Sequence, residues 1–338
     1  MNGMSVGNVD SKRVGVDEAR SLAREVLERI PLPRRDAEFA AAHLISAELR
    51  GYPGHGLQRL LVIASMSDEF GRSDHNRPII IKPGFALFDG QRRLGIPAIQ
   101  DALAEASERL DDLATIAFGV QGYVGTTGSL GIYASQLSQR GVISILMCTS
   151  EASVAPHGSR RAVLGTNPIA IGFPGSPTSF CSDIATAAWS WGAIKRAAAT
   201  GKTLPLGVVQ TLDGMPSTDP NDAEKGSQLP TGGHKGYALG LAVELLCGPL
   251  IGAKAGRNAV SGTHGFFGVL VRVDAARSAI ASNADAQALF GEIRAGPPTD
   301  PDIPIRIPGE SAQLGEQTTR HFDVPQDLFD KLQELRKS

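Results

Sequence analysis

Hydrophobic positions recur with a helical period in several stretches of the chain. In residues 17–30, Leu22, Val26 and Ile30 fall on one face of a helix, and Pro31 and Pro33 end it. The same pattern predicts four more helices and a short amphipathic helix near the C-terminal end, at residues 36–49, 59–70, 97–110, 128–141 and 323–338.

Short apolar runs lie between these helices and predict strands at residues 78–84, 114–120 and 142–148. The segments 165–174 and 181–192 each indicate a further strand or turn with polar residues at its tip. Because helices and strands alternate along the chain, the pattern favours an α/β fold over a helical bundle or a β-sandwich.

Two stretches break this alternation. Residues 197–233 are rich in Gly, Pro, Asp, Thr and Ser, which favour turns and offer little to bury. They predict a long surface excursion, which is a lid, a subunit contact or a plain solvated loop. Residues 295–310 form a proline-rich connector.

Composition narrows the functional classes. The chain has 338 residues, 42% of them hydrophobic, and a net charge of −2, so it can bury one large or two moderate cores. The chain has no block of basic residues that would suggest nucleic-acid binding. It also has no run of about 18 apolar residues, the length needed to span a membrane. The polar first residues lack the apolar core of a signal peptide, so a cytoplasmic location is expected. Cys148, Cys181 and Cys247 lie far apart and indicate reduced core residues.

Residues 229–253 open with glycines and a basic pair and continue into a long apolar helix. The first turn of a helix presents unsatisfied N–H groups and the positive end of the helix dipole. Gly232 and Gly233 permit close approach of a ligand, and Lys235 adds a positive charge. The segment therefore fits a phosphate. A flexible loop that caps a core helix, with an exposed lysine, fits it equally well.

Gly125, Gly128 and Gly131 follow a predicted strand and suggest a dinucleotide fold. Their spacing is G-x-x-G-x-x-G rather than G-x-G-x-x-G, and only Glu151 offers an acidic residue about 20 positions on. The segment therefore argues against an ordinary Rossmann domain, and a glycine turn that contacts a cofactor in another geometry stays open.

His55 and Arg59 are four residues apart, so one small cavity could hold both side chains. Histidine exchanges a proton near neutral pH, and arginine binds a carboxylate through two parallel hydrogen bonds. A capping histidine beside a surface arginine is the alternative. His157 and His264 have no partner in sequence, and no ligand spacing predicts a metal site. The polar tips at Thr166 and Asn167 and at residues 181–192 would complete a pocket for a small carboxylate and a phosphate-bearing cofactor.

Taken together and in order, the motifs resemble one family along nearly the whole chain. They are GHGLQRL, LGTNPIAIGFP, SDIATAAWSWG, GMPSTDP, LPTGGHKGYALGLAVELLCGPLIGA, GTHGFFGVLVRVD, IPGE and the closing DVP with its helix. This set is similar to the non-Rossmann malate/L-lactate dehydrogenase family, which includes sulfolactate, ureidoglycolate and diketogulonate dehydrogenases and the reductases of piperideine-2-carboxylate and pyrroline-2-carboxylate. The resemblance implies a homodimer that uses NADH or NADPH, with active sites near the subunit interface.

The resemblance also implies a domain division and residue roles. Residues 1–75, which carry His55 and Arg59, would pack with residues 305–338, and residues 76–304 would form a mixed-sheet α/β cofactor domain that includes the excursion 197–233. His55 would be the proton donor, and Arg59 and Thr166 would bind the substrate. The implied cofactor contacts are Gly128, Ser129, Leu130, Asp183, Ile184, Ala185, Thr186, Lys235, Gly236, Pro308, Gly309 and Glu310.

Three positions depart from the family pattern. Gly54 stands where the family has a serine before the histidine, Thr126 where it has a second histidine, and Ala193 where the imine reductases have an acid. An acid relay to His55 is therefore missing, which argues against imine reduction.

The sequence thus predicts an NAD(P)-dependent oxidoreductase that transfers a hydride between nicotinamide and C2 of a small 2-oxo or 2-hydroxy acid. Reduction of a cyclic imino acid is the closest alternative. A cofactor-binding homologue with little or no turnover is an alternative of another class. Arg160, Arg161, Lys195 and Arg196 are candidates for a 2′-phosphate partner by charge alone.

Overall fold

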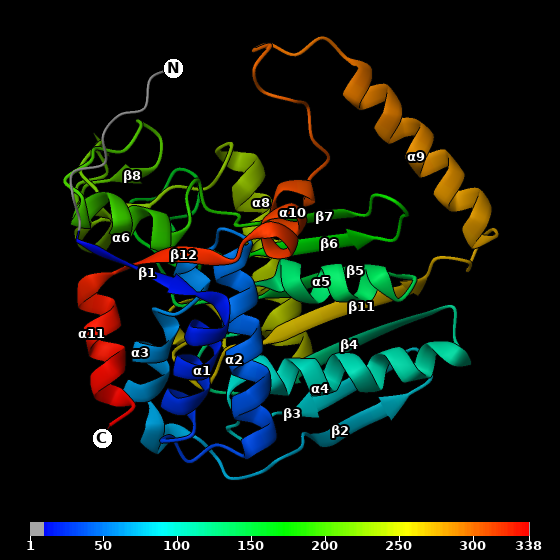
Figure 1. Cartoon of the computed structure of the whole chain (residues 1–338), viewed down its shortest axis with the longest axis horizontal. Coiled ribbons are helices and arrows are strands. Elements are labelled where there is room, and N and C mark those ends of the chain that lie inside the picture. Colours follow the sequence, from blue (N-terminus) through cyan, green and yellow to red (C-terminus); the bar gives the residue numbers. More distant parts are fainter. Residues whose placement is uncertain (1–9, 338) are drawn as a thin grey trace.

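A seven-stranded mixed sheet forms the centre of the computed structural model, which describes residues 10–337 (Figure 1). In spatial order the strands are β2 (Arg77–Lys82), β3 (Phe85–Asp89), β4 (Thr115–Gln121), β11 (Phe266–Arg272), β5 (Val142–Cys148), β6 (Ile169–Phe173) and β7 (Phe180–Ile184). Only β3 and β4 are parallel, and every other neighbouring pair is antiparallel. This sheet is not that of a Rossmann domain, so the predicted non-Rossmann α/β fold is confirmed.

Helices cover the two faces of the sheet unequally. On one face, α4 (Gly95–Glu108) and α5 (Leu130–Gln139) bury a core that includes Phe88, Phe118 and Leu146. On the other face, α8 (His234–Cys247) contributes Val243 and Cys247 to a smaller cluster. The three cysteines are buried and free, and burial raises the pKa of the Cys148 thiol to about 12.

The two ends of the chain meet in a helical layer. Strand β1 (Ser11–Gly15) pairs with β12 (His321–Pro325), and their helices share one apolar core. This layer contains α1 (Val16–Leu27), α2 (Arg34–Leu49), α3 (Arg59–Ser65) and α11 (Gln326–Leu335). The packing of the two ends supports the predicted domain division, which stays a prediction.

The remaining elements lie around these layers. They are α6 (Trp191–Ala199), α7 (Asp222–Lys225), α9 (Ala279–Ala295), α10 (Glu310–Thr318), and short 3-10 helices at Pro53–His55, Ser67–Glu69, Arg109–Asp111, Pro249–Ile251 and Gly256–Asn258. Helix α9 runs along the periphery (Figure 1). In the part of the chain that the structure describes, no helix has both the length and the hydropathy needed to cross a bilayer.

The segment 197–233 is more ordered than its composition predicts. Its strands β8 (Val209–Gln210), β9 (Pro216–Ser217) and β10 (Ser227–Gln228) form a small sheet. Leu204, Val208 and Val209 are buried against Ile194 of α6. Its few apolar residues thus gather into one small satellite core while most of the segment stays exposed, and the surface excursion stays a prediction.

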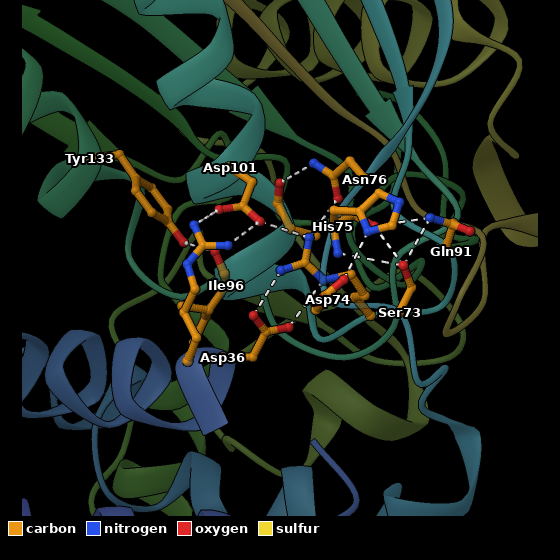
Figure 2. Close-up of polar contacts among 12 residues, drawn as sticks. Asp36, Ser73, Asp74, His75, Asn76, Gln91, Ile96, Asp101 and Tyr133 are labelled. Atoms are coloured by element: carbon orange, nitrogen blue, oxygen red, sulfur yellow. Dashed lines mark hydrogen bonds and ion pairs between the residues drawn. The ribbon is translucent and has the colours of Figure 1, made fainter. Parts of the chain in front are cut away.

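Arg93 joins the helical layer to the sheet. It is 1% exposed, and its guanidinium donates to both carboxylate oxygens of Asp36, the third residue of α2, at 3.0 and 2.8 Å. A second ion pair, 2.8 Å long, connects it to Asp101 of α4, and Asn76 accepts a further hydrogen bond at 3.1 Å. Figure 2 shows Asp36, Asp101 and Asn76 within one group of polar contacts. Two carboxylates from different layers thus depend on one buried cation.

Replacing Arg93 with methionine is expected to lower the free energy of unfolding by about 3–5 kcal/mol, because Asp36 would keep a buried charge without its partner. Urea denaturation measures this loss. Arg20→Ala, which breaks the exposed pair with Asp17, serves as the control and should change stability by no more than about 0.5 kcal/mol. Equal effects of the two substitutions would contradict the role assigned to Arg93.

Candidate active site

His55 ends a short 3-10 helix that follows α2, and Arg59 is the first residue of α3. The half-buried Glu48 carboxylate accepts the Leu57 N–H at 2.7 Å and occupies the space beside Gly56, where a Cβ would come within 2.2 Å of it. Arg59 donates from Nε to the Gly54 carbonyl oxygen at 2.7 Å. These contacts fix the turn, and they leave the terminal nitrogens of Arg59 without a hydrogen bond to the residues that the structure describes.

A cavity of about 250 Å³ brings together most of the predicted site. Its lining includes His55, Arg59, Thr166, Gly128, Ser129, Leu130, Asp183 and Ala185. Ser190 and Trp191, from the segment 181–192 that was expected to complete the pocket, also line it, and so do Tyr52 and Pro168, which no sequence motif singled out. Arg196, considered only as a phosphate partner, lies in the same wall.

Burial dominates the electrostatics of the cavity. Burial, and after it the charge of Arg59, lower the pKa of His55 to about 4. Burial also lowers the pKa of Arg59. The Nδ1 atom of His55 is buried and has no hydrogen-bond partner among the described residues. At neutral pH the imidazole is therefore neutral and can accept a proton.

The loop before α5 is held by Asp183. One Asp183 oxygen, Oδ2, accepts the Ser129 hydroxyl at 2.9 Å and the Gly131 N–H at 2.7 Å. Burial raises the pKa of this carboxyl, and the two hydrogen bonds oppose the shift. Ser129 also donates its backbone N–H to Nε2 of His43, a buried histidine of α2 that the sequence analysis did not single out.

A ladder of backbone hydrogen bonds connects the cavity to the glycine loop before α8. The Thr186 N–H donates to the Thr166 carbonyl oxygen, and the Thr231 N–H donates to the Thr186 carbonyl oxygen, both at 2.9 Å. Gly236 packs directly on this ladder, since a Cβ there would lie 2.1 Å from the Thr231 oxygen. The structure therefore places Thr186 and Gly236 behind the cavity, and Ile184 faces away from it with 54% exposure.

Lys235 lies outside the cavity. It is exposed, and its ammonium makes no ion pair with any residue in the range 10–337. Beside it, Gly232, Gly233, His157 and Arg160 line a larger open hollow of about 950 Å³. Both glycines have positive φ, and Gly232 has open space where a Cβ would stand. This open cradle at a helix start fits the phosphates of a dinucleotide.

The IPGE segment lies against β7, away from the cavity lining. The Pro308 carbonyl oxygen accepts the Cys181 N–H at 3.0 Å, and Gly309 has a φ of +96° where it passes this strand. Glu310 forms an ion pair with Arg294 and accepts the Ile307 N–H at 2.7 Å. In this structure the three residues anchor α10, and their cofactor role stays a prediction. No group of three or more potential metal ligands occurs among the described residues.

The family model described as malate/L-lactate dehydrogenase matches residues 14–333. The chain belongs to this family. The resemblance inferred from the motifs is thereby confirmed, and so is the expectation of a dehydrogenase or reductase.

Relatives and solved structures agree with this placement. The chain is 33% identical over 253 residues to an L-sulfolactate dehydrogenase from Methanothermobacter thermautotrophicus, which covers 74% of each chain. It is 34% identical over 245 residues to a Delta(1)-pyrroline-2-carboxylate/Delta(1)-piperideine-2-carboxylate reductase from Pseudomonas aeruginosa, covering 71% of this chain and 72% of the relative. A dehydrogenase structure from Sinorhizobium meliloti superposes with a TM-score of 0.90 at 33% identity, covering 97% and 98% of the two chains.

Stability should fall as the pH drops below about 6.5. The unfolded chain then protonates His43 and His55, whereas the folded chain, with pKa values of about 3 and about 4, does not. Each imidazole contributes a slope that approaches about 1.4 kcal/mol per pH unit. Urea unfolding at about pH 7, 6 and 5 measures this slope, which should be smaller in His43→Gln. An identical slope in the variant would show that His43 is not buried in its neutral form.

Proposed function

We propose that this protein is a nicotinamide-dependent oxidoreductase that interconverts a small 2-oxo acid and its 2-hydroxy acid. The observation that carries the proposal is the shared cavity of His55 and Arg59 with the loop residues Gly128–Leu130 and with Asp183. One cavity thus holds a proton carrier, a carboxylate-binding cation and two segments that the family resemblance assigns to the cofactor.

Arg59 holds the substrate carboxylate. Its Nε already bonds to Gly54, so the guanidinium plane is fixed and its terminal nitrogens are free for two parallel hydrogen bonds. The Thr166 hydroxyl lies within 3.1 Å of the Ser150 hydroxyl and can turn toward the substrate. Arg196 adds a second positive charge to the wall. The cavity therefore favours anionic acids.

His55 moves the proton at the substrate C2 oxygen. With a pKa of about 4, it starts as a neutral base, which suits oxidation of the hydroxy acid. In the reverse direction, a carboxylate bound to Arg59 offsets the charge that lowers the pKa of His55. Substrate binding then favours the protonated imidazole that reduction needs.

The nicotinamide group supplies the hydride when NADH or NADPH is bound. Gly128, Ser129, Leu130, Asp183 and Ala185 would hold it at the cavity, and Gly232, Gly233 and Lys235 would meet its phosphates. Arg160 lines the hollow beside these glycines, which makes it the better placed candidate for a 2′-phosphate.

Reduction of a cyclic imino acid is the second candidate, because the Pseudomonas aeruginosa relative has that activity in its name. Gly54 and Ala193, which replace the serine and the acid of the imine reductases, both line the cavity. A Cβ on Gly54 would meet Gly192 at 3.5 Å, an ordinary contact, so a serine would fit there. The absence of both groups leaves Nδ1 of His55 without a partner and favours 2-oxo acids.

A homologue without turnover is the candidate of another class. Calorimetry with NADH and NADPH, run beside an assay of 2-oxo acids and piperideine-2-carboxylate, separates these possibilities. Dinucleotide binding without any oxidation of NADH or NADPH would support the inactive homologue and would overturn the proposed activity.

We also propose a homodimer. Helix α8 and the segment after it expose Leu239, Leu245 and Leu250 at 46%, 54% and 53%. On the sheet, Ile145 and Ile171 are also exposed, at 38% and 39%. Apolar side chains in this number on one helix and a sheet are typical of a surface that a second copy covers.

Two substitutions test the proposed chemistry. His55→Ala should lower kcat by about 10²–10⁴-fold, because the proton carrier is lost. Arg59→Ala should raise KM for the 2-oxo acid by about 10–100-fold, because charged hydrogen bonds to the carboxylate are lost. Steady-state assays with both cofactors measure these effects, and His75→Ala, on an exposed side chain, should be neutral. Full kcat in His55→Ala would remove His55 from the mechanism.

Light scattering should give twice the 35.5 kDa chain mass for the wild type. Leu245→Glu places a charge on the exposed face of α8 and should shift the protein to the monomer mass. Val62→Glu, at a 41% exposed position of α3, is the matched control and should stay dimeric. A monomeric wild type at micromolar concentration would contradict the proposed dimer.

A further inference from the structure

His43 is a buried imidazole that the proposed reaction does not use. It lies on α2, is 3% exposed, and accepts the Ser129 backbone N–H at its Nε2 atom at 3.0 Å. Because Nε2 accepts, the neutral ring carries its proton on Nδ1. His43 is therefore a fixed acceptor that faces the loop of the candidate site.

The loop is in close contact with this ring. Gly128 has a φ of +74°, and a Cβ on it would come within 2.2 Å of the His43 Nε2 atom. The Tyr133 ring lies 4.7 Å from the His43 ring, and the Tyr133 hydroxyl donates to the Thr127 carbonyl oxygen at 3.0 Å. Residues 127–129 are thus held from two sides. The segment 121–131 has no histidine of its own, and the imidazole that contacts it comes from α2.

The same contact reaches a second segment of the site. Ser129, whose N–H is bound to His43, donates its hydroxyl to Asp183 at 2.9 Å, and Asp183 lines the cavity. One acceptor on α2 therefore binds the loop 128–130 and is linked through Ser129 to the carboxylate near the end of β7. A shift of either segment would move groups that the proposed function assigns to the cofactor.

The surroundings keep His43 in its accepting form. Burial, and after it the nearby His55 and Arg50, lower its pKa to about 3. A protonated Nε2 would point a donor at the Ser129 N–H, which is also a donor. The other neighbours of the ring are the aromatic side chains of Phe39 and Tyr133. Near neutral pH neither of them competes with His43 Nε2 for the proton of the Ser129 N–H.

We propose that His43 is the positioning residue of the cofactor loop, holding Ser129, and through it Asp183, in the arrangement that binds the dinucleotide. The proposal rests on the proposed function, because that function assigns the loop to the cofactor. His43 thereby adds a residue of the helical layer to a cofactor site whose other proposed residues lie in and around the sheet.

Two similar variants test the proposal. The amide oxygen of glutamine reaches about as far from the backbone as Nε2, whereas that of asparagine is one bond too short. His43→Asn should raise the Kd for the dinucleotide and the exchange rate of the Ser129 amide by about tenfold or more, with kcat at saturating cofactor changed by less than about threefold. His43→Gln should keep all three within about threefold of the wild type.

Calorimetry with NADH and NADPH and hydrogen-exchange mass spectrometry on the peptide around residue 129 give these values. Wild-type values in His43→Asn would overturn the proposal, and so would equal losses in both variants while their far-UV circular dichroism stays native. If the wild type binds neither dinucleotide, the proposed function fails. The exchange rates still decide whether His43 holds Ser129, and unchanged rates would reject that role.

Discussion

The ion pairs of Arg93 set how the helical layer meets the sheet, and the candidate site exists only where those layers meet. His55 and Arg59 come from the helical layer, whereas Asp183 comes from β7 of the sheet and Thr166 from the loop before β6. Arg50 of the helical layer adds a second tie, a 2.6 Å ion pair to Glu316 of α10 together with a 3.4 Å hydrogen bond to the Gly131 carbonyl oxygen. Because a displacement of about 1 Å between reacting groups can cost 10²-fold in rate, these distant contacts matter to the chemistry.

Much of the fold could be predicted from hydrophobic periodicity, and the failures have physical causes. The helix predicted at 36–49 and the strand at 142–148 match α2 and β5 closely. Helix α9 was missed because it buries only Phe290 and shows no apolar stripe. The order of the strands is set by long-range pairing, as where β11 enters between β4 and β5, and periodicity carries no information about such pairs.

In the candidate site, residues that are close in sequence could be predicted together, whereas residues far apart in sequence could not. His55 and Arg59 could be paired from their spacing, since a turn and the start of a helix keep them close. His43 and Arg196 could not be placed, because they reach the loop or the cavity from elements far apart in sequence, whereas Trp191 lies in the segment 181–192 that was expected to complete the pocket. Lys235 could be predicted as a positive charge at a helix start, but its position outside the cavity and beside the larger hollow could not.

Burial acts on His55 in the opposite direction to the hydrogen bonds of an acid relay. A serine or carboxylate at Nδ1 would stabilise the imidazolium, whereas Gly54 and Ala193 leave that nitrogen unpaired and the neutral ring favoured. Such a histidine accepts a proton readily only when the charge of Arg59 is offset, which is what an anionic substrate does. Protonation then follows substrate binding, so the acid form of His55 arises where a carboxylate is already held. A cyclic imino acid also carries a carboxylate, but its basic nitrogen brings its own proton, and the resulting cation would disfavour a charged imidazole beside it. The proposed preference for 2-oxo acids over imino acids therefore rests on the charge distribution of the cavity as well as on its missing residues.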